Sequence, residues 1–401
     1  MNRLLYNSIK IGFVFSAVFS AVASAQINKI SGTITDADSD EPIPFANVFF
    51  ASTSIGISSD MEGKFVLQNF PNGKYDFTVA YVGYEPFQQA FEFNGSEYRL
   101  TIKLKTNEVK LNEVIIKADT TGWAQNFAIF KRNFLGETAN ASNCTILNPR
   151  DIHLYFDKQD GILVAHARKP IVIENKALGY TIQWYMQKFE LNYRNGRLEV
   201  FGIPLFQQLD PKNERQLKQW TQERERAYRG SITHFMRTLL RKNWLDEGFE
   251  VRLVNLVPNP ERPSKEFLDK KLTALKADIT SSGDSLKYYS RLAAKPELIE
   301  EVSRALAGAE QIINDQTQTM LKRTLAVRYK NEKEEPAYPP TVGRTTRKVQ
   351  DSVLRIFDEM KIYSNGYYEP VQNLFVEMYW GWSEKISDML PLDYSPGVSL
   401  K

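Results

Sequence analysis

The stretch DMEGKFVLQNFPNGKYDFTVAYVGYEP, residues Asp60–Pro86, decides the fold of the first part of the chain. Apolar and polar residues alternate within its short runs, so that Tyr75 and Val79 fall on one face of an expected strand. Gly63 can take the positive φ that a tight turn requires, and Asp60 is expected to accept hydrogen bonds from backbone amides of its own turn. The stretch therefore predicts strands with one buried face and one wetted face.

The same alternation recurs on both sides of this stretch, from Ile30 to Ile116. Seven short runs show it, separated by Gly, Pro, Asn and Asp, at residues 29–35, 44–50, 63–69, 74–81, 87–93, 98–104 and 112–117. Several short strands with turn residues between them are typical of two antiparallel sheets packed face to face. We therefore expect a seven-stranded β-sandwich at residues 26–117.

The motifs SGTITDADSDEPIPFANVFF, GISSDMEGKFVL and PNGKYDFTVAYVGYEP resemble the carboxypeptidase regulatory-like domain, a sandwich of the transthyretin-like type. The resemblance covers less than a quarter of the chain. It implies an accessory module of bacterial envelope proteins, not peptidase activity. NEVKLNEVIIKAD also resembles the junction that follows this domain in TonB-dependent outer-membrane transporters. The 282 residues after it are too few for a plug and a 22-stranded barrel, at about 10 residues per strand.

The first 25 residues have the pattern of a secretory signal. Arg3 and Lys10 precede an apolar run from residue 11 to 22, and the following AVASA predicts cleavage before Gln26. A membrane anchor is the alternative, but the run is shorter than the roughly 20 residues that a spanning helix needs. Cleavage would remove two positive charges and lower the formal charge from +3 to +1, which argues against nucleic-acid binding. We expect an exported protein of the periplasm or outer-membrane periphery, without a transmembrane span.

Residues that could hold a metal lack the spacing of known sites. His153, His166 and His234 have no Glu three residues on, and HExxH is absent, so the zinc site of a carboxypeptidase is not expected. Asp36, Asp38 and Asp40 imitate the start of a calcium loop. Glu41 and Asn47 occupy the sixth and twelfth positions, where that loop needs Gly and Glu, and a solvated turn is the better interpretation. Cys144 is the single cysteine and is expected to be a small buried apolar residue. We expect no cofactor and no metal.

Residues 118–401 are predicted to form a mixed α+β domain of unknown function around an antiparallel sheet. Asn195-Gly196 and Asn365-Gly366 are hairpin signals. A long helical pattern runs over residues 211–243 with Asp210 as its cap, and Gly230 within it indicates a close backbone approach or a break between two helices. A helical insertion is expected at about residues 263–315, with three amphipathic helices at 264–279, 284–294 and 296–313.

One polar cluster on the long helical pattern is a candidate ligand pocket. Its members are Arg224, Arg226, Tyr228, Arg229, Ser231 and His234. Functionally, the arginines with Ser231 and His234 could hold a carboxylate or a phosphate. Structurally, the same residues would be a packed histidine, a small serine and a solvated arginine face, and this interpretation is favoured. Tyr379, Trp380 and Trp382 could likewise form a sugar-stacking platform, although such aromatic residues more often belong to a core.

The sequence thus predicts an α+β protein without catalytic residues that serves binding or assembly in the cell envelope. The expected partners are another envelope protein or a glycan, with peripheral membrane association and no nucleic acid. Two alternatives stay open. One is a glycan-binding or transport-associated accessory protein, and the other is an enzyme that uses the Arg, Ser and His cluster.

Overall fold

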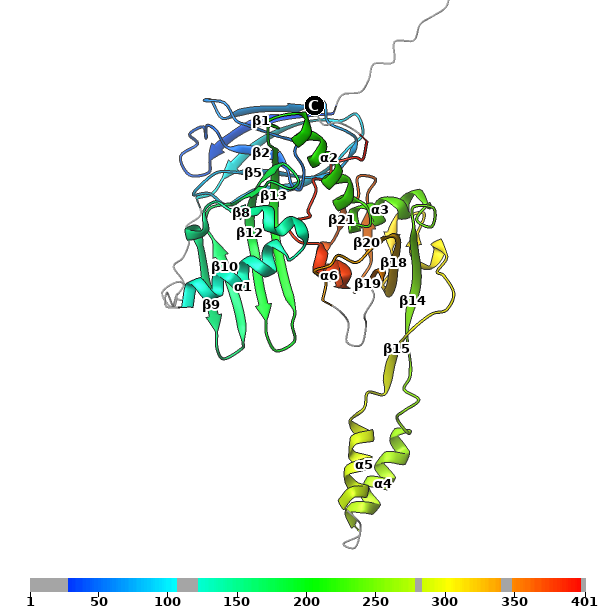
Figure 1. The fold of residues 1–401 in the computed structure, drawn as a ribbon. Coiled ribbons are helices and arrows are strands. Elements are labelled where there is room, and N and C mark those ends of the chain that lie inside the picture. The colour runs from blue at the N-terminus through cyan, green and yellow to red at the C-terminus, as the bar shows by residue number, and fades with distance from the viewer. Residues whose placement is uncertain (1–27, 107–121, 278–282, 340–347, 398–401) are drawn as a thin grey trace, which may run out of the picture.

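The computed structural model describes residues 28–106, 122–277, 283–339 and 348–397. Within these ranges the chain consists mostly of β-sheets, accompanied by six α-helices (Figure 1). The predicted fold class, an N-terminal β-sandwich followed by α+β structure, is confirmed. The expected signal peptide and the expected boundary between residues 117 and 118 lie outside the described residues. No described helix is both long and apolar enough to cross a membrane.

The N-terminal sandwich has two sheets, of three and four strands. The first has the order β4-β1-β7 and contains β1 (Lys29–Asp36), β4 (Lys64–Gln68) and β7 (Glu97–Leu104). The second has the order β3-β2-β5-β6 and contains β2 (Asn47–Phe50), β3 (Gly56–Ser58), β5 (Gly73–Ala80) and β6 (Phe87–Phe93). Aromatic residues fill the space between the sheets, and Phe50 alone contacts four other rings.

The turn chemistry predicted for this sandwich is confirmed. Gly63 has φ +70°, and a Cβ there would lie 2.4 Å from the carbonyl oxygen of Ile34, so only glycine fits. Asp60 Oδ1 accepts hydrogen bonds from the backbone N–H groups of Glu62 and Lys64 at 3.0 and 2.7 Å. Six of the seven predicted strands form. The seventh, at residues 112–117, lies outside the described residues, and β3 was not predicted because three half-exposed residues carry almost no alternation.

Beyond the sandwich, a separate six-stranded sheet follows helix α1 (Trp123–Leu135), and it is called the second sheet below. Its strands run in the order β8-β11-β12-β10-β9, with β13 on the far side of β12. They are β8 (Cys144–Ile146), β9 (Ile152–Asp157), β10 (Ile162–Ala167), β11 (Ile171–Asn175), β12 (Tyr180–Asn192) and β13 (Leu198–Gln208). Phe130 and Phe134 of α1 pack on Phe189 and Trp184 of β12. The hairpin predicted at Asn195-Gly196 joins β12 to β13, and Cys144 is buried as expected.

The long helical pattern forms two helices rather than one. They are α2 (Glu214–Tyr228) and α3 (Ile232–Arg241), and Asn213 rather than Asp210 caps α2 by accepting a hydrogen bond from Gln216 N–H. Gly230 lies at the break with φ +76°, and a Cβ there would come within 2.6 Å of Tyr329. The predicted break between two helices is therefore observed, whereas the close neighbours of Gly230 are the side chains of Tyr329 and Gln350 and not another backbone.

A third sheet has the order β15-β14-β18-β19-β22 and packs on α3. Its strands are β14 (Phe249–Pro258), β15 (Leu298–Val302), β18 (Arg323–Lys333), β19 (Val349–Ile356) and β22 (Leu374–Met378). A small sheet adds β16 (Ile313–Asn314), β17 (Thr319–Met320), β20 (Met360–Ile362) and β21 (Tyr368–Glu369), and helix α6 (Tyr379–Ser383) follows β22. Short 3-10 helices occur at Ala139–Asn143, Pro149–Asp151, Ala309–Gln311 and Val371–Asn373. Phe235 and Leu239 of α3 lie in the core of this region.

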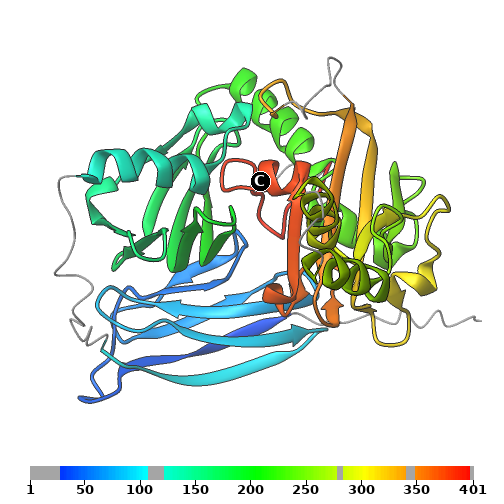
Figure 2. The same ribbon diagram turned by 90° about the horizontal axis from the view of Figure 1, so that it is seen from below.

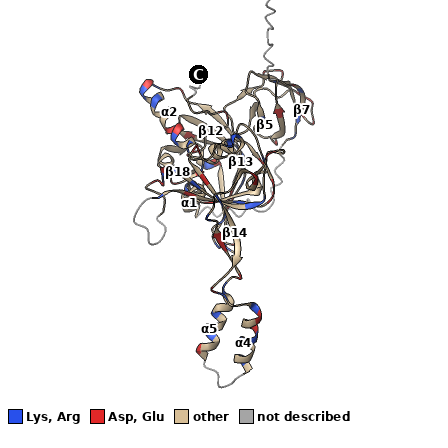
Figure 3. Ribbon diagram, turned by 90° about the vertical axis from the view of Figure 1, so that its right-hand side faces the viewer, with Lys and Arg blue, Asp and Glu red and all other residues tan. Residues whose placement is uncertain are grey.

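Two helices of the predicted insertion form an arm that projects from the rest of the molecule (Figures 1 and 3). They are α4 (Lys265–Ala277) and α5 (Gly283–Ala294), and β14 and β15 carry them away from the third sheet. The third predicted helix, at residues 296–313, is wrong. Residues 298–302 form strand β15 instead, because pairing with β14 outweighs the weak helix preference of this short segment.

The sandwich lies against the second sheet on one side and against the β20–β21 hairpin of the small sheet on the other (Figure 2). Phe49 stacks on Tyr185 of β12 at 5.7 Å, and Asn47 donates a hydrogen bond of 2.9 Å to the Tyr185 hydroxyl. On the other side, Tyr367 donates a hydrogen bond of 2.8 Å to Asp76. The C-terminal segment, in red, runs between the second and third sheets. The three large cores, which belong to the sandwich, the second sheet and the third sheet, are therefore held in one arrangement by these contacts and by the C-terminal segment.

Candidate functional site

A cleft of about 520 Å³ lies where these parts meet. Strand β13 forms one wall, β22 and α6 form the opposite wall, and the junction of α2 and α3 closes one side. The C-terminal segment from Glu384 to Tyr394 contributes most of the remaining lining. The volume of the cleft is within the range of ordinary ligand sites. Its walls come from segments far apart in the sequence, so the cleft exists only in the assembled fold.

The β13 wall is built around Trp184 and Gly202. Trp184 is 4% exposed and lines the cleft, and its indole Nε1–H has no hydrogen-bond partner among the described residues. A Cβ at Gly202 would lie 2.3 Å from that Nε1, so only glycine lets the indole lie flat on this strand. An unpaired buried donor costs free energy unless a ligand or water accepts from it. The nitrogen itself is fully buried beneath Gly202, so a ligand in the cleft would contact the Trp184 ring and not its N–H.

Arg237 holds the C-terminal segment in place beside the cleft. Its guanidinium donates to the backbone carbonyl oxygens of Asn365, Leu392 and Tyr394 at 3.0, 2.7 and 2.9 Å, and its side chain lies 5.4 Å over the Tyr228 ring. No carboxylate forms an ion pair with Arg237 within the described part of the chain. Its positive charge is thus met by dipoles alone and adds a positive potential to the cleft.

Glu384 and Lys385 lie side by side on the cleft lining. Glu384 accepts a hydrogen bond of 3.1 Å from Ile232 N–H at the start of α3, and burial raises its pKa to about 8. Burial lowers the pKa of Lys385, and its ammonium group has no hydrogen bond or ion pair among the described residues. The cleft therefore contains one free amine and one carboxyl group that favours its neutral form.

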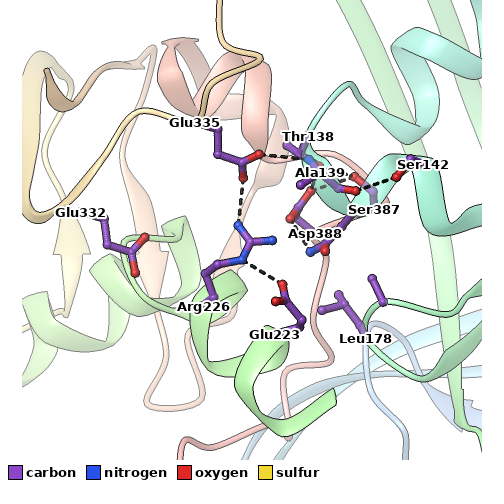
Figure 4. Close-up of polar contacts among 12 residues, drawn as sticks. Thr138, Ala139, Ser142, Leu178, Glu223, Arg226, Glu332, Glu335, Ser387 and Asp388 are labelled. Carbon is purple, nitrogen blue, oxygen red and sulfur yellow. Dashed lines mark hydrogen bonds and ion pairs between the residues drawn. The ribbon is translucent and has the colours of Figure 1, made fainter. Parts of the chain in front are cut away.

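A polar network around Arg226 lies near the cleft and ties α2 to two distant segments (Figure 4). Arg226 pairs with Glu223 and with Glu335, both at 2.9 Å, and Glu335 also accepts a hydrogen bond of 3.0 Å from Ala139 N–H. Burial opposes the charge of Arg226, but the two carboxylates outweigh it and raise the pKa of the guanidinium. We interpret these contacts as a structural clamp.

Asp388 anchors the C-terminal segment to the connection between α1 and β8 in the same region (Figure 4). It accepts hydrogen bonds from Thr138, from Asn140 at 2.8 Å and from Ser387 at 2.7 Å. Burial raises its pKa despite these donors. No group of three or more His, Cys, Asp or Glu side chains in the described ranges is arranged to hold a metal ion. The acidic residues here hold segments of the chain together through hydrogen bonds.

The structure does not bring the six predicted pocket residues into one site. Tyr228 and Ser231 line the cleft. Arg224 is buried 4.2 Å over the Tyr180 ring and donates to the carbonyl oxygens of Leu178 and Gly179, whereas Arg229 pairs with Glu225 on the surface. Arg224 and Arg226 lie on different faces of α2 and Arg229 lies just past the end of that helix, so the three arginines share no ligand position.

Ser231 and His234 have structural partners. The Ser231 side chain caps α3 by accepting a hydrogen bond of 3.1 Å from His234 N–H. His234 is buried, accepts from Gly230 N–H through Nδ1 at 3.1 Å, and packs against the rings of Tyr228 and Phe249, tilted on the first and edge-on to the second. Burial lowers its pKa to about 4, so the ring is neutral at pH 7. Neither residue is placed as a nucleophile with its base.

The C-terminal aromatic residues are mostly part of a core. Tyr379 and Trp380 are buried, and Trp380 Nε1–H donates a hydrogen bond of 2.7 Å to the carbonyl oxygen of Gly230. Trp382 packs edge-on against Tyr338 at 5.4 Å. These three side chains therefore do not form a flat exposed platform, although Trp380 lines one side of the cleft.

The residues that matter most for the cleft were not among the predicted site residues. Trp184 looks like any inward aromatic of an alternating strand, and Glu384 and Lys385 look like surface charges. One signal could have been used, because Gly202 within an apolar strand pattern indicates a close approach of another group.

The N-terminal module is, by its seven strands and two sheets, a β-sandwich domain. Residues 30–116 match the CarboxypepD_reg-like domain family, which confirms the resemblance seen in the sequence. No curated protein matches the chain.

Solved structures show only distant likenesses. The TIE protein of Bacillus anthracis is 21% identical over 20% of this chain and 17% of its own length, with a TM-score of 0.15. A candidate membrane-associated protein of unknown function from Bacteroides fragilis is 11% identical over 87% of this chain and 94% of its own, with a TM-score of 0.17. A candidate carbohydrate-binding protein from Bacteroides uniformis is 10% identical over 44% of this chain and 78% of its own length, with a TM-score of 0.17. TM-scores in this range do not establish a shared overall fold.

Proposed function

We propose that this chain is a non-catalytic, exported protein of the cell envelope that binds a ligand or partner in the central cleft. The observation that carries the proposal is the cleft itself, with the Trp184 ring and the unpaired Lys385 amine in its lining. These groups offer binding energy that the folded chain does not use. The same lining presents no hydroxyl or thiol nucleophile next to a free base.

The sandwich would serve as a support that fixes the distance between the two walls of the cleft. It contacts the β12–β13 wall through Phe49 and Tyr185, and the β20–β21 hairpin through Asp76 and Tyr367. Ser54 N–H also donates a hydrogen bond of 2.8 Å to Asp393 in the C-terminal segment. A regulatory-like domain with this role would be accessory, in keeping with the resemblance described above.

The envelope location rests on the sequence. A signal peptide at residues 1–25, a regulatory-like domain at residues 26–117 and an α+β region at residues 118–401 remain our proposal for the organisation of the chain. The single cysteine, Cys144, is buried on β8. The chain therefore needs no disulfide in an oxidising compartment.

Thermal shift assays on the full chain would test the proposal. The panel would contain oligosaccharides, short peptides and short-chain lipids, and we expect at least one class to raise the melting temperature. Trp184→Phe and Lys385→Ala should each abolish that shift, whereas Lys158→Ala, in the exposed β9–β10 turn, should not.

Two outcomes would contradict the proposal. A ligand shift that survives both cleft variants would place binding elsewhere. Mass spectrometry of the ligand after incubation supplies the second check, because a chemical change in a stabilising ligand would show that the protein is an enzyme.

A further inference from the structure

One edge of strand β13 carries backbone groups that nothing in the described structure satisfies. On its other edge β13 pairs with β12 from Leu198 to Gln208. Arg197 C=O accepts a hydrogen bond of 2.9 Å from Asn192 N–H, which places the odd-numbered residues of β13 on the β12 side. The N–H and C=O groups of Leu198, Val200 and Gly202 therefore point away from β12, and all three residues line the cleft.

The far end of β13 shows that this edge can pair with another chain segment. Pro204 C=O accepts a hydrogen bond of 2.7 Å from Ser52 N–H, and Phe206 N–H donates one of 3.0 Å to Thr53 C=O. A loop of the sandwich thus already uses the last part of the edge. From Leu198 to Gly202 the edge has no hydrogen-bond partner among the described residues. Unpaired edges of this kind are templates for an added strand.

The opposite wall of the cleft is a second sheet edge. Strand β22 pairs with β19 on one side only, in a register fixed by the 2.9 Å hydrogen bond from Phe357 N–H to Asn373 C=O. The backbone groups of Val376 and the carbonyl oxygen of Leu374 therefore face away from β19. Both residues line the cleft. At one end the walls meet, since the Arg197 guanidinium lies 5.8 Å over the Phe375 ring.

The unpaired charges in the cleft are complementary to an anionic group. The Lys385 ammonium has no hydrogen bond or ion pair among the described residues, and its neighbour Glu384 favours its neutral form. The hydrogen bonds of Arg237 all go to carbonyl oxygens. Glu199 on the β13 wall is already paired with Lys188 and Arg197. A ligand that brings one carboxylate to Lys385 would supply the missing counter-charge.

We propose that the cleft binds an extended polypeptide segment that adds to the edge of β13 as a β-strand and brings a carboxylate to Lys385. The inference rests on the proposed binding function and names the ligand class. The open N–H and C=O groups of β13 recur at every second residue, about 6.8 Å apart, which is the repeat of a β-strand. The hydroxyl groups of a glycan do not present alternating donors and acceptors at this spacing.

The test is a selection from a random nonapeptide library with free C-terminal carboxylates, carried out on the full chain. The enriched peptides are then measured by fluorescence anisotropy against three proteins: the unchanged chain, Val200→Pro and Val200→Ala. Proline removes the N–H that faces the cleft and leaves the β12 ladder intact, whereas alanine keeps that N–H and removes the same side-chain packing. Circular dichroism and melting curves check that both variants fold.

We expect Val200→Pro to weaken binding at least tenfold and Val200→Ala to weaken it less than threefold. N-methylation of alternate peptide residues should reproduce the tenfold loss on the unchanged protein. Lys385→Ala should weaken peptides with a free carboxylate and leave their C-terminal amides unaffected.

Equal affinity for all three proteins, or tolerance of N-methylation in both registers, would overturn strand addition. Failure to enrich any peptide would overturn the peptide assignment. If a sugar or lipid still stabilised the protein in a Trp184-dependent way, the proposed binding function would stand and only the present inference would fail.

Discussion

Tyr367 donates a hydrogen bond of 2.8 Å to Asp76, and this contact joins the C-terminal β20–β21 hairpin to a strand of the N-terminal sandwich. The two residues are 291 positions apart. Burial raises the pKa of Asp76, so its carboxylate depends on this phenol and on nearby Lys74 for stabilisation. Lys74 also lies 3.6 Å from Glu369 of the same hairpin. A few buried polar contacts thus hold two parts of the chain in register around the cleft.

Replacing Tyr367 with Phe should destabilise the protein by about 1 to 3 kcal/mol at pH 7, because it leaves a buried carboxylate without its donor. The loss should shrink as the pH falls, since Asp76 then takes up a proton in the folded state. Urea unfolding at pH 7 and pH 4.5 measures both effects. Tyr193→Phe is the matched control, because Tyr193 is 49% exposed and its hydroxyl makes no hydrogen bond among the described residues. An equal effect of the two variants would show that the Asp76 contact contributes nothing.

Glu384 should make the protein less stable as the pH rises. Its pKa is about 8 in the folded protein and near 4.5 when unfolded, so between these values the folded state binds more protons. Stability from this group is therefore complete below pH 4.5 and declines up to pH 8. Glu384→Gln keeps an acceptor for Ile232 N–H and removes the charge. At pH 8 we expect the free energy of unfolding of Glu384→Gln to exceed that of the unchanged chain by about 1 to 2 kcal/mol, and at pH 4.5 we expect no difference. The gain is modest because the carboxyl group reaches solvent through the cleft. A difference independent of pH in thermal unfolding would contradict this.

His234 should make the protein less stable as the pH falls, which is the opposite of the effect of Glu384. Its pKa is lowered to about 4 by burial, against about 6.5 when unfolded, so the unfolded state binds more protons between these values. The stability that the neutral ring provides is complete above pH 6.5 and is lost as the pH falls towards 4. Glu247, Arg229 and Arg237 are the charged groups nearest the ring. The expected loss is about 3 kcal/mol. NMR titration of the ring proton checks it directly, and a midpoint above pH 6 would show that the ring is not held neutral.

Alternation and turn residues predicted much of the fold because they report local requirements. A strand that buries one face must alternate, and Asn195-Gly196 and Asn365-Gly366 both connect paired strands as expected. The strand at 298–302 could not be found this way, since a few apolar residues fit a helix or a strand equally well. Only the presence of β14 beside it decides the outcome.

The cleft could not be predicted for a related reason. Its walls come from β13, β22 and the C-terminal segment, and nothing in the sequence says that these lie together. The polar cluster on α2 drew attention because its residues are close in sequence. In the fold, Arg224 lies on the buried face of α2, whereas Arg229 lies just past the end of that helix and pairs with Glu225 on the surface.

Gly230→Ala should be far more costly than Gly196→Ala, although both glycines have φ near +70°. At Gly230 the new Cβ would lie 2.6 Å from Tyr329, whereas at Gly196 nothing lies within 4 Å. We expect about 1 kcal/mol for Gly196→Ala, which is the cost of the backbone conformation alone. For Gly230→Ala we expect about 3 kcal/mol or more, because steric overlap is added in a packed core. Chemical denaturation of both variants gives the comparison, and similar losses would show that Tyr329 can move aside at little cost.

Removing the α4–α5 arm should leave the rest of the protein folded. Within the described residues of the two helices, Leu268 is the only buried side chain, and the arm projects away from the three cores (Figure 3). Replacing residues 264–295 with a short Gly-Ser linker keeps the hydrogen bond from Asn259 to Pro296 C=O. It removes the exposed ion pair between Lys295 and Glu261, which contributes less than about 1 kcal/mol. We expect the melting temperature to change by no more than about 3 °C, with cooperative unfolding retained. A large drop or a broad transition would show that β14 and β15 need the arm to pair, and substituting Leu268 with Ala in the full chain would then reproduce part of the loss.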